Sequence, residues 1–377
     1  MEKVYLVAVY AHINSVSNGS TGKIMFQEHE GLLSQGEESF AFWGRGRAPR
    51  NKNEFRFATD REVYLDVVQT RLDGRAGFHS KRATKRLLKK LDEVNPDIVH
   101  LHNVHGYYVN IEMLFAWLVD HDCQVKWTLH DCWAFTGHCA YFTYAKCTQW
   151  KIHCAYDEPC CQLYTYPKTY SKHSCAINYE EKRRIFTSIS PDKMTLITPS
   201  YWLEGLIRES FLKNYLITVR HNSVDTTIFK PTSSDFRERY GIGNRFMILG
   251  VASPWTERKG LQDFLQLSKK LDSKRFAIVL VGLSKKQIKA LPKEVIGLKR
   301  TDSARELAAI YTAADIFFNP TYEDNYPTVN LEAQACGTFV VTYDTGGCSE
   351  TVNDKGLSIA ALESFIDIVN NKEAYIK

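Results

Sequence analysis

The chain contains 377 residues, of which 44% are hydrophobic and 24% are charged, as in an ordinary globular protein. One hydrophobic core rarely serves so long a chain, so the length predicts two domains. The formal net charge of +5 is too small to predict binding to nucleic acid, although it allows contact with anionic lipid or with phosphorylated substrates.

The sequence also bears on the compartment. It has no run of about 18 apolar residues, so no membrane-spanning helix is predicted. Its first residues have the pattern of a strand and not of a signal peptide, so a cytoplasmic protein is expected. In a reducing compartment the ten cysteines would be thiols or metal ligands rather than disulfides.

The N-terminal segment predicts a ligand-binding turn. Residues 3–10 read as a buried strand, residues 14–23 as a polar turn, and a helix follows from Ile24. Helix N-termini that follow strands bind anions, which makes Gly19, Gly22 and Lys23 candidate binding residues. The alternative is a plain turn in which Thr21 caps the helix.

A basic amphipathic helix is predicted over residues 79–91. Such a helix can lie on a membrane surface, which would make the protein a peripheral membrane protein at the inner face. An ordinary solvated face is the alternative. Its basic residues are Lys81, Arg82, Lys85, Arg86, Lys89 and Lys90.

Polar side chains stand at the ends of two further strands. His102 and Asn103 follow the strand that begins at residue 97, and His130 and Asp131 follow the strand over 124–129. Strands and helices alternate here, which predicts a parallel, doubly wound α/β sheet. Because ligands bind at the carboxyl ends of such strands, these residues are candidates for a ligand crevice; each histidine alone is as consistent with a structural role.

An irregular, cysteine-rich insertion covers about residues 132–161. It has little helical or strand periodicity, so something must hold it together. Four thiolates could bind a structural zinc ion, although the usual C-x2-C spacing is missing. Buried free thiols are the alternative. The expected zinc ligands are Cys139, Cys147, Cys154 and Cys160.

A second series of strands and helices begins at Phe246, after a polar junction over residues 231–243. The strand over 246–252 leads to Arg258 and Lys259 at the start of a helix, a placement that suits a diphosphate. Ordinary surface charge beside Glu257 is the alternative.

The stretch over residues 319–338 is the strongest site signal. It follows an apolar strand over 314–318 and contains Glu323 and Asp324 in a turn, then a helix that carries Glu332. A carboxylate on that helix could accept hydrogen bonds from vicinal sugar hydroxyls. A second strand over 339–343 leads to a turn with Gly346 and Gly347, and a last helix covers about 360–370.

Several runs together resemble the large retaining glycosyltransferase family 4, and the resemblance covers nearly the whole chain. It implies the GT-B fold of two facing Rossmann-like domains: residues 1–230, on the acceptor side, and residues 231–377, which bind the nucleotide sugar. That the last helix packs back on the first domain is left open. The cysteine insertion resembles that of enzymes of capsule, exopolysaccharide, colanic-acid or O-antigen assembly. The runs are 18–24, 100–103, 128–131, 198–200, 258–260, 306–315 and 319–338.

The resemblance implies a role for each matching residue. Glu332 corresponds to the second glutamate of the Glu-x7-Glu motif, which binds ribose, and Asp324 stands where the first glutamate contacts the donor sugar, with Glu323 as the alternative. Lys259, with Arg258, corresponds to the phosphate-binding cation, and His130 to the histidine beside the donor sugar. The residues Asn325, Tyr326 and Pro327 lie where the loop approaches the donor.

The implied reaction transfers a sugar, with retention, from a nucleoside-diphosphate sugar to a glycan or lipid-linked glycan acceptor. No catalytic metal is expected, because the only Asp-x-Asp, at Asp120 and Asp122, precedes a strand. Three alternatives stay open: a nucleotide-sugar epimerase or phosphorylase of the same fold, a non-catalytic nucleotide-sugar-binding protein, and a metal-binding interaction module built on the cysteine insertion.

Overall fold

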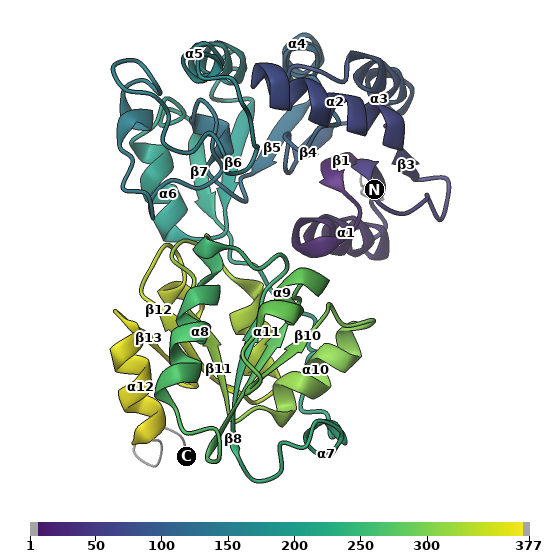
Figure 1. Ribbon diagram of the computed structural model, residues 1–377. Helices are drawn as coiled ribbons and strands as arrows, with labels where there is room; N and C mark the ends of the chain where they lie inside the picture. The colour runs from purple at the N-terminus through teal and green to yellow at the C-terminus, as the bar shows by residue number, and fades with distance from the viewer. Residues whose placement is uncertain (1–6, 372–377) are drawn as a thin grey trace. The chain divides into compact units, whose positions relative to one another are not determined.

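A computed structural model describes residues 7–371 of the chain. The chain divides into two compact units, Met1–Arg220 and His221–Lys377. We predicted this boundary at residue 230. Both boundaries lie in the segment that follows the last strand of the first unit. Figure 1 colours the first unit from purple to teal and the second from green to yellow.

The first unit contains a seven-stranded sheet of order β3-β2-β1-β4-β5-β6-β7, in which neighbouring strands pair in parallel. This confirms the predicted doubly wound α/β architecture. Its strands are β1 (Val9–Val16), β2 (Glu38–Arg45), β3 (Glu54–Arg56), β4 (Ile98–Leu101), β5 (Gln124–Thr128), β6 (Met194–Thr198) and β7 (Leu216–Val219). Its helices are α1 (Gly19–Ser34), α2 (Asp60–Asp73), α3 (Lys81–Val94), α4 (Ile111–Asp120), α5 (Ser174–Phe186) and α6 (Tyr201–Arg208).

The first strand and helix differ from the prediction. The strand expected at 3–10 lies partly outside the described residues, and β1 continues to Val16 through a stretch that we predicted to be a turn. Its polar residue Asn14 is buried but satisfied, because its amide donates to the Val16 carbonyl (3.0 Å) and to Thr21 Oγ1 (3.3 Å). Helix α1 begins at Gly19 rather than Ile24, so Thr21 lies inside the helix and is not its cap.

The second unit repeats the same strand order in a six-stranded sheet, β10-β9-β8-β11-β12-β13, also with parallel pairings throughout. Its strands are β8 (Phe246–Val251), β9 (Phe276–Val281), β10 (Val295–Leu298), β11 (Ile316–Asn319), β12 (Phe339–Tyr343) and β13 (Gly356–Ile359). Its helices are α7 (Phe236–Arg239), α8 (Leu261–Lys270), α9 (Lys285–Ala290), α10 (Ala304–Ala313), α11 (Thr328–Ala335) and α12 (Leu362–Asn370).

Both faces of the second sheet are buried, as a parallel sheet requires. Ile248 and its alternate neighbours pack with α8 and α12 in one hydrophobic cluster, and Leu249 and its alternates pack with α10 and α11 in another. The central strands β8 and β9 therefore read as continuous apolar runs.

The last helix belongs to the core of the second unit. Phe365 of α12 is fully buried and stacks on Phe318 with ring centroids 3.8 Å apart. We left open that this helix returns to the first domain; its apolar face is instead occupied by β11 and α8 of its own unit.

The cysteine-rich insertion lies between β5 and α5. Apart from two single turns of 3-10 helix, η1 (Trp133–Phe135) and η2 (Gln149–Lys151), it consists of turns and bends, in agreement with its lack of periodicity. Within residues 7–371, no helix has both the length and the apolar composition needed to cross a bilayer.

Candidate active site

The strand order of each sheet reverses at one point, between β1 and β4 in the first unit and between β8 and β11 in the second. Helices leave the sheet on opposite faces there, so the carboxyl ends of these strands form the ligand crevice of a doubly wound fold. The predicted site residues follow these strands, or the adjacent β5.

In the second unit, the loops after β8 and β11 are in close contact. Tyr322 N donates to the Arg258 carbonyl (2.8 Å), and a Cβ atom on Gly260 would lie 2.1 Å from the Pro320 carbonyl oxygen. Gly260 also has a φ of +72°, which an L side chain rarely adopts. The glycine therefore allows α8 to begin directly against the loop that carries the acidic pair.

Lys259 and Asp324 form an ion pair across this contact, with 20% and 17% of their side chains exposed. Asp324 Oδ1 also accepts a hydrogen bond from Asn325 N (2.9 Å). Burial raises the pKa of the Asp324 carboxyl, but the nearby cations Lys259 and Arg258 outweigh burial and hold the pKa below its usual value. Asp324 is thus an anion held beside the predicted phosphate-binding cation.

Glu323 is placed differently. Its side chain is fully buried, and its carbonyl accepts hydrogen bonds from Arg258 Nη1 and from Thr321 Oγ1 (3.2 Å). Asp324 thus pairs with Lys259, while the backbone of Glu323 anchors Arg258.

The paired glycines complete this corner. Gly347 N donates to the Asp324 carbonyl (2.9 Å), and a Cβ atom on Gly346 would lie 2.1 Å from the same oxygen. Three segments that are far apart in the chain, at Arg258–Gly260, Glu323–Asn325 and Gly346–Gly347, thus meet around Asp324.

Glu332 lies on α11 and is half-buried. Its Oε2 accepts a hydrogen bond from the hydroxyl of Tyr311 (3.2 Å), a buried residue of α10. Burial, and then the nearby Glu332 carboxylate, raise the pKa of Tyr311, so this phenol remains a donor. We did not predict Tyr311 as an orienting residue. It lies in the run over residues 306–315 that resembles the glycosyltransferase family, which could have identified it.

The loop that enters α11 is rigidly held. Tyr326 stacks on His221 with ring centroids 4.8 Å apart, and Pro327 directly precedes the helix. Asn330 accepts from Asn319 Nδ2 (2.9 Å) and donates to Thr351 Oγ1 (2.8 Å). Backbone N–H groups at the start of α11 can therefore point toward an anion without reorganisation of the loop.

In the first unit, a small pocket lies at the ends of β4 and β5, and His102, Asn103, His130 and Asp131 all line it. His102 Nδ1 lies 3.2 Å from His130 Nε2, and the two rings stack with centroids 5.5 Å apart. Burial lowers the pKa of His130 to about 4, although Asp131 opposes this shift, so the imidazole is neutral at pH 7.

His105 also lines this pocket, and the sequence analysis missed it. Its Nε2 lies 3.0 Å from Asp131 Oδ2, and its Nδ1 lies 3.0 Å from the hydroxyl of Tyr166. Burial raises the pKa of Asp131, but His105 outweighs it and the net shift is downward. The signal for His105 was its spacing, since it stands three residues after His102 in the same loop.

The predicted glycine turn is the first turn of α1. Gly19 has a φ of +71°, and a Cβ atom on Gly22 would lie 2.6 Å from the Ser17 carbonyl carbon. Gly22 therefore allows α1 to approach the end of β1, and Lys23 is exposed on the same turn.

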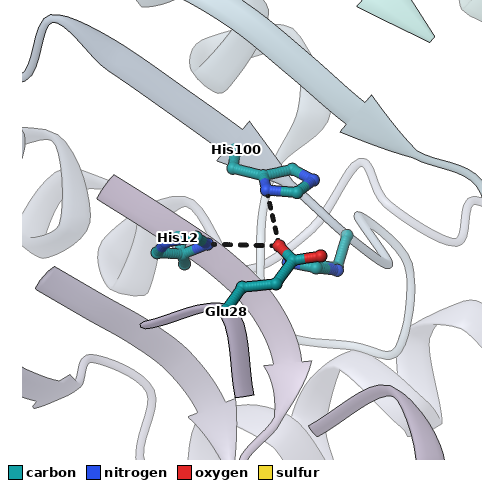
Figure 2. A group of neighbouring side chains, drawn as sticks. His12, Glu28 and His100 are labelled. Atoms are coloured by element: carbon teal, nitrogen blue, oxygen red, sulfur yellow. Dashed lines mark ion pairs between the residues drawn. The ribbon is translucent and has the colours of Figure 1, made fainter. Parts of the chain in front are cut away.

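Beneath this turn lies a cluster that the sequence analysis did not identify: His12 of β1, Glu28 of α1, and His100 and His102 of β4 and its end. One donor atom from each residue lies within 4.8 Å of all the others. Figure 2 shows the Glu28 carboxylate between His12 and His100. Burial raises the pKa of Glu28, but His100 and Arg220 outweigh it, and the pKa is about 2.

The cysteines of the insertion form a thiol network that differs from the predicted ligand set. Hydrogen bonds from the thiols of Cys139 and Cys175 lower the pKa of Cys160 to about 3. Cys147 instead interacts with Cys161. Cys139, Cys147, Cys154 and Cys160 all line one pocket, together with Cys161, and the zinc ion predicted there stays a prediction.

Comparison with known proteins agrees with this architecture. Residues 244–371 match the family described as Glycosyl transferases group 1. The chain is 21% identical over 375 residues to the protein of Escherichia coli strain K12 named as a colanic acid biosynthesis glycosyl transferase, WcaC; the match covers 94% of this chain and 87% of that protein.

Solved structures share the fold. Sucrose-phosphate synthase from Thermosynechococcus elongatus superposes with a TM-score of 0.69 at 15% identity, over 97% of this chain and 90% of its own. Anabaena Alr3699/HepE, in complex with UDP-glucose, gives 0.63 at 13% identity, over 97% and 89%. The chain is therefore a glycosyltransferase of the GT-B fold whose second unit carries the group 1 glycosyl transferase domain.

Proposed function

We propose that this glycosyltransferase moves a sugar from a nucleoside-diphosphate sugar to an acceptor hydroxyl, with retention at the anomeric carbon. The observation that carries the proposal is the corner around Asp324. It brings two cations, a carboxylate, two glycines and a helix N-terminus to the switch point of the second sheet. Alr3699/HepE, which shares the fold, was solved with UDP-glucose.

Each part of this corner suits one part of such a donor. Lys259 and Arg258 would hold the diphosphate and stabilise the charge that develops on it as the glycosidic bond breaks. Glu332, oriented by Tyr311, would accept hydrogen bonds from the ribose hydroxyls. Asp324 would accept from hydroxyls of the transferred sugar, with its charge maintained by Lys259.

In the first unit, we assign His130 to the sugar and Asn103 to substrate binding; His102, which is fully buried, would act by orienting His130. A neutral imidazole can both donate and accept a hydrogen bond, which suits a sugar hydroxyl. No catalytic metal is needed in this scheme. Asp120 ends α4 before β5 begins, so the Asp-x-Asp lies at the edge of the sheet away from the carboxyl ends.

The biological role that we propose is surface polysaccharide assembly at the cytoplasmic face of a bacterial membrane, with a glycan or lipid-linked glycan as acceptor. The full-length similarity to the WcaC protein supports this proposal. The exposed basic residues of α3 would make the peripheral contact with anionic lipid.

The test is a transfer assay with a panel of nucleoside-diphosphate sugars and lipid-linked acceptors. We expect Glu332→Gln and Lys259→Met each to reduce kcat/KM at least about 100-fold, since each removes a preorganised polar contact to the donor. Lys270→Met is the matched control, because Lys270 is an exposed lysine of α8 that pairs with Glu363.

Normal transfer by both site variants would contradict the site assignment. Donor binding without a glycoside product on any acceptor would indicate a binding protein, and release of a free sugar nucleotide or sugar phosphate would indicate an epimerase or phosphorylase. Inversion at the anomeric carbon, read by NMR of the product, would exclude the retaining mechanism.

A further inference from the structure

The central strands of the first sheet carry imidazoles where a doubly wound fold normally has aliphatic side chains. His12 on β1 lies opposite His100 on β4 in the strand register, and both are at most 3% exposed. The alternate residues Ala11 and Ile13 pack into the main hydrophobic core on the other face. The face that carries the histidines is covered by α1, which contributes Glu28.

Polar atoms in this cluster lack partners. Both ring nitrogens of His12 and Nε2 of His102 are buried without a hydrogen bond. Glu28 Oε2 lies 2.8 Å from His100 Nδ1, 3.8 Å from His12 Nδ1 and 3.8 Å from His102 Nε2. Burying so many polar atoms without partners is costly, and native proteins rarely tolerate it. His12 Nδ1, His100 Nδ1 and His102 Nε2 thus surround one carboxylate oxygen, an arrangement that suits a bound cation.

In three of these residues, the polar atoms that face away from the centre form hydrogen bonds or an ion pair, as those of metal ligands usually do. His100 Nε2 lies 2.8 Å from Thr128 Oγ1, and His102 Nδ1 lies 3.2 Å from His130 Nε2. The other carboxylate oxygen of Glu28 pairs with Arg220. These contacts orient three of the four donors toward the centre of the cluster.

We propose that His12, Glu28, His100 and His102 bind one divalent transition-metal ion, for which zinc is the best match. Three imidazole nitrogens and one carboxylate oxygen are ligands that zinc accepts in tetrahedral geometry. With ligand bonds of about 2.0–2.1 Å, tetrahedral donors lie about 3.3 Å apart. The contacts of 2.8 to 3.8 Å that Glu28 Oε2 makes lie near that spacing, and the remaining donor pairs lie within 4.8 Å.

Four protein ligands leave no open position, so this ion is structural rather than catalytic. It ties α1, which begins with the Gly19–Lys23 turn, to the ends of the two central strands. It also bears on His130: an ion on His102 Nε2 leaves the proton on Nδ1, which then donates to His130 Nε2. The site does not depend on the proposed sugar-transfer reaction.

The first test is metal analysis of the purified full-length protein, by mass spectrometry of its elemental content, beside the variants His12→Phe and Glu28→Gln. We expect each variant to contain one equivalent less zinc per chain than the wild type and to bind added zinc at least about 100-fold more weakly. His29→Phe is the matched control, because His29 is a buried histidine of α1 outside the donor set. It should keep the wild-type zinc content.

The stability of His12→Phe also distinguishes a metal-bound cluster from a metal-free one. Without a metal, a phenyl ring in place of an imidazole with two unpartnered nitrogens should leave the protein as stable or make it more stable. With a metal, the variant loses a ligand, and its thermal midpoint in the presence of zinc falls below that of the wild type. Equal metal content in the wild type and both variants, or a stabilised His12→Phe protein, would overturn the proposal.

A cobalt titration of chelator-treated wild type needs no variant and distinguishes this site from the cysteines. Cobalt bound by nitrogen and oxygen in a tetrahedral site absorbs in the visible range without the near-ultraviolet charge-transfer band of thiolate ligands. We expect one equivalent to bind with that signature. Uptake accompanied only by the thiolate band, or no uptake, would refute the histidine site.

Discussion

At the scale of single residues, the pair of Lys259 and Asp324 determines the charge of the proposed donor site. The cation that would bind phosphate and the carboxylate that would bind sugar are in contact with each other. A bound diphosphate can replace Asp324 as the partner of Lys259, which would release the carboxylate toward sugar hydroxyls. An aspartate suits this exchange because its short side chain is positioned by the Asn325 N–H.

This pair predicts a pH dependence of stability. Because the folded pKa of Asp324 lies below its unfolded value, the ion pair contributes stability above about pH 4, and this contribution is lost as the pH falls through the folded pKa. Asp324→Asn should therefore destabilise the protein by about 1–3 kcal/mol at pH 7. The difference from wild type should shrink toward zero in acid, as measured by urea unfolding over a pH series.

Glu363→Gln serves as the control for this measurement, because Glu363 forms an exposed pair with Lys270. Exposed pairs contribute little, so no measurable change is expected. A difference between wild type and Asp324→Asn that is constant from pH 7 into acid would show that the carboxylate charge is not the cause.

Gly260 gives a second prediction at this scale. Its positive φ and the 2.1 Å approach of Pro320 O leave no room for a side chain. Gly260→Ala should cost roughly 2 kcal/mol or more in the free energy of unfolding, measured with urea. Gly205→Ala is the control: it lies within α6 with nothing within 4 Å of the added Cβ, so it should be neutral or stabilising. Equal effects would contradict the steric explanation.

At the scale of elements, α1 links the glycine turn to the histidine cluster. Gly22 allows the helix to approach β1, and two turns later Glu28 reaches the imidazoles on β1 and β4. The sequence analysis identified the glycines but not the cluster, because His12 stands in a stretch that we assigned between a strand and a turn. Only the strand pairing places it beside His100.

The cysteine-rich insertion is held by more than its thiols. Lys182 of α5 is buried, donates to the carbonyls of Trp133 (2.7 Å) and Thr136 (2.9 Å), and lies over the Trp133 ring. Burial lowers the pKa of Lys182 to about 7. A structural zinc ion on the cysteines stays a prediction, and Cys175, which we did not consider, is close to Cys160.

Helix α3 has the amphipathic pattern that the sequence predicted, with Leu87 and Leu91 buried. Some of its basic residues are engaged within the protein: Arg86 donates to the Phe57 carbonyl (2.9 Å) and pairs with Glu62. Lys81, Arg82, Lys85 and Lys89 are exposed and would carry the proposed contact with anionic lipid.

At the scale of the whole molecule, two sheets of the same strand order carry different chemistry at their switch points. The first has imidazoles and Asp131, and the second has cations paired with carboxylates. The second unit is therefore expected to bind the nucleoside diphosphate, since a cation pair and a helix N-terminus follow its central strands.

This division predicts where a nucleotide protects the chain. In hydrogen exchange of the full-length protein, saturating UDP should slow exchange most in residues 256–261, 322–332 and 345–348, because bound ligand stabilises the conformation that binds it. The segment over 284–293, which contains α9 and follows β9 in the same unit, is the internal control. Protection confined to the pocket of the first unit would contradict the assignment.

The sequence alone determined the α/β class, the two units and the short runs of the donor site, because strand–helix periodicity and glycine, cation and carboxylate positions are local properties. It could not show that Asp324 pairs with Lys259, since that depends on how two loops far apart in the chain approach each other. Nor could it join His12, Glu28, His100 and His102. Their proximity results from the register of the parallel strands and from the position of α1 on the sheet. Both are fixed only when the whole unit packs.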